Sequence, residues 1–294
     1  MLKKFMSLMM GLILVGSLSV NIKGETVRNA NDFLILGAGA RALGMGGAFS
    51  AVSDDGSGAL FNPAGLVQIV NPEIASMYAA RENKVSDIFL AYAHPLKGGC
   101  LAISFLRTQV TDIHVTRELT SQEIADLEKG IFSYIPDTTR SASDNALVVS
   151  YARRLNPKLC VGINGKYLYR DLVKMVDGQG YGIDLGMQYR VLSDLKLGLA
   201  IYDLYSRTSW SGRLDNLNDK PSVSSNERAT PSWKLGGAYT HFLDNELLRS
   251  IILALDIEGE IASSSDFIFH FGSELNFVKI MAMRVGIIVN RQNG

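Results

Sequence analysis

The sequence predicts an all-β protein, a transmembrane antiparallel β-barrel. Three observations support this fold class. Segments of about ten residues alternate between apolar and polar side chains, as strands with two unlike faces do. Short connections between these segments alternate with longer ones. An export signal at the N-terminus precedes a chain with no further long apolar stretch, so any membrane crossing must use strands.

The first 24 residues are expected to be a cleaved signal peptide. Lys3 and Lys4 precede an apolar run at 9–15, and small residues follow, so we place cleavage between Ser19 and Gly24. The apolar run is shorter than the roughly 20 residues that a spanning helix needs, which disfavours an uncleaved anchor. The expected location is the bacterial outer membrane.

Alternation is clearest at 180–190. Successive strand side chains point to opposite faces, so this segment has one apolar and one polar face. The apolar face carries Tyr181, Ile183, Leu185, Met187 and Tyr189, and the other carries Gly182, Asp184, Gly186, Gln188 and Arg190. A soluble sandwich also alternates, but its strands average about five or six residues. Ten tilted residues is about the length that a membrane-spanning strand needs.

Eleven strands are predicted on this pattern. They lie near 73–82, 86–95, 100–112, 143–155, 159–171, 180–190, 195–205, 231–241, 250–260, 267–276 and 280–290. The longest connections, 113–142 and 206–230, are expected outside the cell, because outer-membrane barrels have short periplasmic turns and longer extracellular loops. A short helix is expected at 120–131.

Composition and motifs disfavour other classes of function. Lys plus Arg and Asp plus Glu both number 29, so no basic excess suggests a nucleic-acid partner. Cys100 and Cys160 are expected to be free thiols, and the four histidines lack metal-ligand spacing. We therefore predict no cofactor, no metal and no enzyme activity. A barrel enzyme remains an alternative, because His270 shares a predicted face with Glu274, Asp256 and Arg284, but a network of ion pairs explains that face as well.

A glycine-rich stretch at 33–49 imitates a dinucleotide-binding motif through Gly37, Gly39 and Ala42. The motif requires a helix immediately after the turn, whereas Gly44, Gly46 and Gly47 follow, and glycine is unfavourable inside helices. We therefore reject nucleotide binding. Asp54 and Asp55 are interpreted as turn and cap residues, with a bound cation as the alternative.

The segment 37-GAGARALGMGGAFSAVSDDGSGALFNPAGL-66 resembles the N-terminal signature of PorV/PorQ-type proteins, a family of FadL-like outer-membrane β-barrels. The resemblance implies a barrel whose N-terminal segment folds inward as a plug or hatch, here residues 25–70, followed by the barrel at 71–294. It places a hatch motif at Asn62, Pro63, Ala64, Gly65 and Leu66. The residues fit a short helix at 58–61, capped by Asp55 or Ser57 and ended by Asn62, which precedes a proline.

Charged residues on the polar strand faces are expected to line the lumen. They are Lys166, Arg170, Asp184, Arg190, Lys234, Glu258 and Arg284. Such charges either hold a plug in place or line a solute path. Two functions follow from the resemblance: FadL-like transport of hydrophobic small molecules across the outer membrane, or a PorV-like accessory role without transport, in protein secretion or cell-surface attachment. The expected partners are outer-membrane lipid and either hydrophobic small molecules or secretion-system proteins.

The strand count is odd, and single-chain bacterial barrels have even numbers. We therefore expect the sequence to be a fragment that lacks one to three C-terminal strands of a barrel with about 12–14 strands. The alternative is that residues 40–52 form a twelfth strand.

Overall fold

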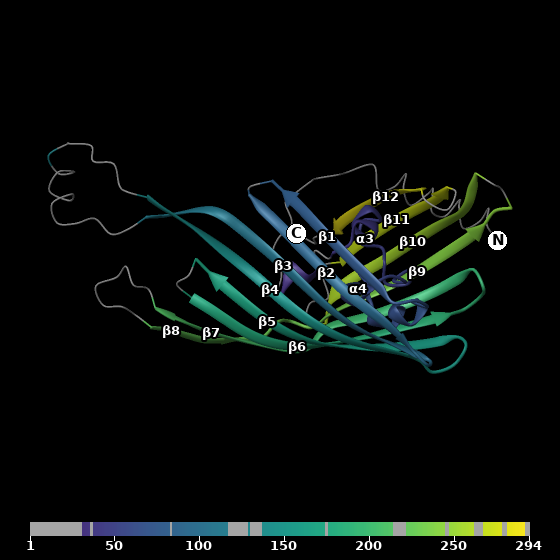
Figure 1. The fold of residues 1–294 in the computed structure, drawn as a ribbon, viewed down its shortest axis with the longest axis horizontal. Helices are drawn as coiled ribbons and strands as arrows, with labels where there is room; N and C mark the ends of the chain where they lie inside the picture. Colours follow the sequence, from purple (N-terminus) through teal and green to yellow (C-terminus); the bar gives the residue numbers. More distant parts are fainter. Residues whose placement is uncertain are drawn as a thin grey trace.

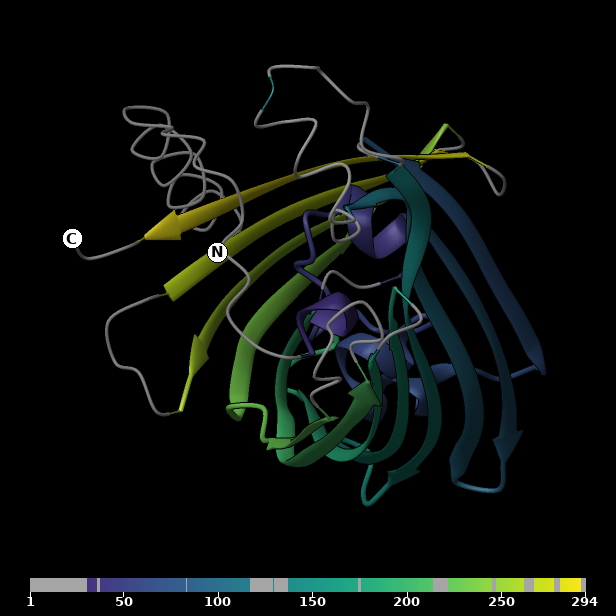
Figure 2. The same cartoon turned by 90° about the vertical axis from the view of Figure 1, so that its left-hand side faces the viewer.

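Twelve antiparallel strands form one sheet that curls around an N-terminal segment of short helices (Figures 1 and 2). The computed structural model describes residues 31–291 apart from 36–37, 83, 117–128, 130–136, 174–175, 214–221, 245–246, 262–266 and 278–280. The signal peptide predicted at 1–24 lies outside these residues, and the helix predicted at 120–131 lies almost entirely outside them.

Strands that are neighbours in sequence are neighbours in the sheet, with one exception. The strands are β1 (Glu73–Arg81), β2 (Val85–Leu96), β3 (Gly99–Thr116), β4 (Asp137–Arg154), β5 (Leu159–Leu172), β6 (Val176–Arg190), β7 (Leu195–Arg213), β8 (Ser222–Glu227), β9 (Ser232–Phe242), β10 (Leu248–Glu260), β11 (Phe267–Phe277) and β12 (Met281–Arg291). The short β8 pairs with β7 alone, at residues 208–213, and β9 pairs with the first part of β7, at residues 195–202. Within the described residues, β1 pairs only with β2 and β12 only with β11.

All eleven predicted strands are present. The predicted loop at 113–142 is shorter than expected, because β3 and β4 continue pairing through Val115 and Thr138. The predicted loop at 206–230 was wrong in part, since β7 extends to Arg213 and β8 pairs with this extension. Alternation failed to mark the extension of β7 and most of β8 because their residues are mainly polar on both faces. We call the end of the barrel that carries these two connections the long-loop end, and the opposite end the short-turn end.

The outer face of the sheet is apolar and the inner face polar or small, as the alternation predicted. In β6, Tyr181 is 51% exposed on the outside, whereas Asp184 is 4% exposed on the inside. Large apolar side chains are exposed on β1 to β7, β9 and β12, the arrangement of a barrel wall that faces lipid. None of the described helices combines the length and apolar character needed to cross a bilayer.

Residues 31–35 and 38–70, the described part of the hatch, lie inside the curled sheet (Figure 2). Their elements are α2 (Asp32–Ile35), α3 (Ala40–Gly44), α4 (Gly58–Phe61) and the 3-10 helix η1 (Pro63–Gln68). The alternative of a twelfth strand at 40–52 is wrong. Gly46 and Gly47 have φ angles of 62° and 75°, in the left-handed region, so the chain turns sharply there.

Candidate functional site

Six glycines on the inner face of the wall bring the hatch into backbone contact with the sheet. They form three directly opposed pairs: Gly162 with Gly186, Gly198 with Gly236, and Gly272 with Gly286. A Cβ atom at any of them would overlap a neighbouring atom; Gly272 is the mildest case, with the carbonyl oxygen of Met45 at 2.7 Å. At five of the six positions that neighbour belongs to the hatch, and at Gly236 it is both Asp256 and Ser50. The hatch therefore packs directly on a seam of glycines in the wall.

Asn62 joins the hatch motif to the wall. Its side-chain nitrogen donates to the carbonyl oxygens of Ser50 at 2.8 Å and Met187 at 3.0 Å, and its Oδ1 accepts from the amide of Ala64 at 3.1 Å. Asn62 adopts an extended conformation, so it ends α4, as predicted, and it also starts η1. The residue is fully buried. The amide thus fixes the shape of the motif and its position against β6 together.

Side chains of the wall also form hydrogen bonds with backbone N–H and C=O groups of the hatch. In a strand or a long helix, other backbone groups would be the partners. Asp256 on β10 accepts from the amides of Phe49 at 3.0 Å and Ser50 at 2.8 Å. Asn164 donates to the carbonyl of Ala59 at 2.8 Å, and Tyr202 donates to that of Phe61 at 2.5 Å. The irregular hatch backbone is therefore stabilised by the wall.

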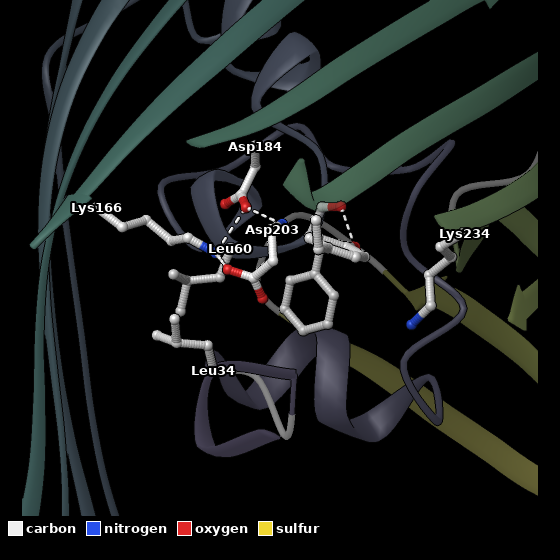
Figure 3. Close-up of a pocket in the computed structure, with 8 residues that line it drawn as sticks. Leu34, Leu60, Lys166, Asp184, Asp203 and Lys234 are labelled. Atoms are coloured by element: carbon white, nitrogen blue, oxygen red, sulfur yellow. Dashed lines mark hydrogen bonds and ion pairs between the residues drawn. The ribbon is translucent and has the colours of Figure 1, made fainter. Parts of the chain in front are cut away.

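Lys166 forms the first of three charge clusters inside the barrel, of which the third is partly exposed. Its Nζ lies 2.6 Å from a carboxylate oxygen of Asp184 and 2.6 Å from one of Asp203, and the three side chains are nearly fully buried. Figure 3 shows the lysine extending toward both carboxylates. Asp203 also accepts from Asn31 at 2.9 Å, which links the cluster to the start of the described hatch.

The second cluster lies on β9, β10 and β11. Lys234 Nζ is 2.9 Å from Glu258 Oε2, and His270 Nε2 lies 3.2 Å from the same oxygen. His270 Nδ1 lies 2.7 Å from the carbonyl oxygen of Gly46, at the sharp turn of the hatch. Among the described residues, the partners of His270 are thus Glu258 and Gly46, and not Glu274, Asp256 or Arg284, which the alternative of a barrel enzyme had placed beside it.

Glu274 on β11 is the centre of the third cluster. It accepts from Arg41 of α3 and from Arg284 of β12, with a shortest distance of 2.6 Å to Arg284. Arg41 also pairs with Asp54 and Asp55, and Asp55 accepts from the amide of Ser57 at 3.0 Å. Burial lowers the pKa of Arg41, but the hydrogen bonds and charges of Glu274 and Asp54 outweigh it and raise the pKa above its usual value. The two aspartates are thus turn and ion-pair residues.

Two predicted lumen residues lie apart from these clusters. Arg170 faces inward near the long-loop end, where it pairs with Asp144 at 2.6 Å and lies over the rings of Phe33 and Trp210. Arg190 lies at the short-turn end and is exposed to a cavity. Of the seven residues, Lys166, Asp184, Lys234 and Glu258 are buried, Arg190 and Arg284 line a cavity, and Arg170 pairs with Asp144.

Sequence reasoning missed Asp203, Arg41 and the glycine seam. Asp203 lies within a β-bulge of β7, with a φ of 51°, where simple alternation breaks. The glycines were on the inward parity of their strands, and their recurrence there was a signal that could have been read. The partner of Arg41 lies 233 residues away, which no local pattern encodes.

Two cavities lie on the inside of the wall. A cavity of about 20 Å³ beside Lys166 and Asp203 has room for one water molecule (Figure 3). A second cavity of about 650 Å³, which we call the short-turn cavity, opens at the short-turn end. Its lining includes Arg41, Val52, Asp54, Arg190, Lys196, Phe242, Ile252, Glu274 and Arg284. Among the described residues, no group of three or more His, Cys, Asp or Glu side chains is placed to hold a metal ion.

The fold is shared with solved structures of hydrocarbon channels. The toluene transporter TodX of Pseudomonas putida aligns over 87% of this chain and 84% of its own, at 13% identity and a TM-score of 0.57. The toluene transporter TbuX of Ralstonia pickettii aligns over 87% and 86%, at 14% identity and a TM-score of 0.52. The monoaromatic hydrocarbon channel CymD aligns over 88% and 85%, at 12% identity and a TM-score of 0.52.

Neither protein-family models nor curated proteins give a match to the sequence. These structural likenesses show the fold, an antiparallel β-barrel.

Proposed function

We propose that this protein is an outer-membrane channel for hydrophobic small molecules, with the hatch as its internal gate. The observation that carries the proposal is a hatch fixed to the lumen wall by side chains, with a cavity of about 650 Å³ beside it, in a fold shared with monoaromatic hydrocarbon channels. The short-turn end faces the periplasm in this proposal, because outer-membrane barrels place their short turns there.

A reversible lock between hatch and wall tests the gate. A Cβ atom at Gly56 of the hatch would lie 3.2 Å from that of Ala75 on β1, a little under the roughly 3.8 Å typical of a disulfide. We expect Gly56→Cys with Ala75→Cys to form a disulfide when Cys100 and Cys160 are both replaced by Ala. Each single cysteine variant in the same background is the matched control.

The measurement is uptake of radiolabelled toluene by cells that carry each variant in the outer membrane. The gate predicts low uptake in the oxidised double variant, full uptake after reduction, and no redox effect in the single variants. Equal uptake in both redox states would exclude gating by this part of the hatch. No uptake above empty cells for the unmodified protein would exclude transport of this class of molecule.

The fixed hatch also favours a second function, the non-transporting accessory that the PorV/PorQ resemblance implies. Buried side chains such as Asn62 and Asp256 hold the hatch at many points, as a permanently closed lumen requires. In that case the protein would bind secreted proteins or other barrel subunits. Failure of uptake together with co-purification of a second protein from outer-membrane fractions would support this alternative.

A further inference from the structure

The short-turn cavity has an excess of positive charge. Four cationic side chains line it, Arg41, Arg190, Lys196 and Arg284, against the two carboxylates of Asp54 and Glu274. Glu274 is shared between Arg41 and Arg284, and Asp54 pairs with Arg41. These contacts neutralise the hatch side of the cavity and leave two positive charges on the opposite wall.

Those two charges belong to Arg190 and Lys196. The residues are directly opposed on β6 and β7, and both are on the inward parity of their strands. Like charges at directly opposed positions destabilise a sheet, so the arrangement has a cost that a bound anion would remove.

Neither residue has a carboxylate partner within hydrogen-bond distance among the described residues. The Nζ of Lys196 donates to the neutral amide of Gln68 at 2.9 Å. That amide also donates to Gln188 at 3.0 Å, so Gln68 is fixed in place. The ammonium is therefore held toward the cavity, and two of its three protons remain available for a ligand.

We propose that the short-turn cavity is a binding site for one oxyanion group, a carboxylate or a phosphate, held between Arg190 and Lys196. The planar guanidinium of arginine matches the two oxygens of such a group, and lysine adds a point charge. The cavity volume of about 650 Å³ suits a small molecule. Val52, Phe242 and Ile252 line the same cavity, so an apolar tail attached to the anion could pack there.

Calorimetric titration of the full chain in a neutral detergent tests this proposal without any transport step. The probes are inorganic phosphate, decanoate and, as an uncharged control, decanol. We expect Arg190→Gln with Lys196→Gln to weaken anion binding about tenfold to a hundredfold, the effect of losing charge-assisted hydrogen bonds, and to leave decanol unchanged. Lys97→Gln with Lys158→Gln, in exposed turns at the same end, should bind like the unmodified protein.

The probes also identify the source of the anion. Binding of both phosphate and decanoate indicates a site for free oxyanions, and binding of decanoate alone indicates the head group of an amphiphile. Absence of both, or equal binding by the double variant, overturns the proposal.

A chemical measurement covers the case in which the double variant does not fold. Phenylglyoxal modifies accessible arginines, and peptide mass mapping reports Arg190 in the unmodified protein. Decanoate or phosphate should protect Arg190 from the reagent. Arg154, which is exposed at the end of β4, should remain unprotected. Equal modification of Arg190 with and without either anion overturns the proposal as well.

Discussion

Glu274 on β11 and Arg41 in the hatch form a two-point ion pair, with Nε–Oε2 at 2.7 Å and Nη2–Oε1 at 3.1 Å, across 233 residues of sequence. Glu274 is 2% exposed and also accepts from Arg284 of β12. One carboxylate therefore holds the hatch and the last described strand together.

Replacing that carboxylate should loosen both elements. Glu274→Gln leaves two guanidinium groups without their shared charge, and removing one partner of a buried ion pair typically costs about 3 kcal/mol or more. We expect a lower denaturant midpoint for the folded form, measured by heat-modifiable gel migration. Glu82→Gln, at an exposed position after β1, is the control, and an equal midpoint in both variants would contradict a central role for Glu274.

The glycine seam predicts a steric effect that depends on which face of a strand is changed. In Gly186→Ala the new methyl group would overlap Asn62 and Pro63, so the hatch must move away from the wall. We expect faster proteolysis within the hatch and larger single-channel conductance in planar bilayers.

Gly165→Ala is the matched control, because a Cβ atom at Gly165, on the neighbouring strand, has no other atom within 4 Å. This variant should behave as the unmodified protein. Similar proteolysis of both variants would show that the seam does not position the hatch.

The Lys166 cluster predicts non-additive mutations. Lys166→Met leaves Asp184 and Asp203 buried without a cation, which typically costs about 3–5 kcal/mol. Adding Asp203→Asn removes one carboxylate, retains an oxygen for Asn31, and suits the left-handed backbone at this position, since asparagine tolerates it. We expect the double variant to regain part of the lost unfolding free energy in urea, and a strictly additive loss would argue against a coupled cluster.

The apolar outer face predicts that a charged side chain destabilises the barrel more at the middle of a strand than near its end. Ile183 points outward seven residues from each end of β6. Arg at this position should destabilise the barrel in liposomes by about 2–4 kcal/mol, against about 0–1 kcal/mol near an interface. Ile261→Arg, just beyond the end of β10, provides the second case, and unfolding titrations that give equal values would argue against a bilayer around β6.

Strand positions and inward residues could be predicted because alternation is a local property of the chain. Lys166, Asp184, Lys234 and Glu258 face inward for that reason. Their partners could not be predicted, because pairing across the sheet depends on register, and register depends on the whole curled sheet. The short helix at 58–61 was predicted correctly from its own residues.

The location of the hatch was an expectation from the resemblance, and the structure confirms it. The contacts that hold the hatch there were not predictable. Asp256 binds the amides of Phe49 and Ser50, more than 200 residues earlier in the sequence, and no local pattern relates these groups. The bulge that contains Asp203 also breaks the simple parity rule at a residue of the first cluster.

The three opposed glycine pairs have a consequence for assembly. A slip of one residue between two strands exchanges their inner and outer faces, and large outward residues such as Leu185 would then replace glycine beneath the hatch. Only the correct strand register therefore leaves enough space for the hatch against the wall. Because wall residues from β5 to β12 contact it, a strand in the wrong register would clash with the hatch, so the earliest part of the chain restricts how the later part can pair.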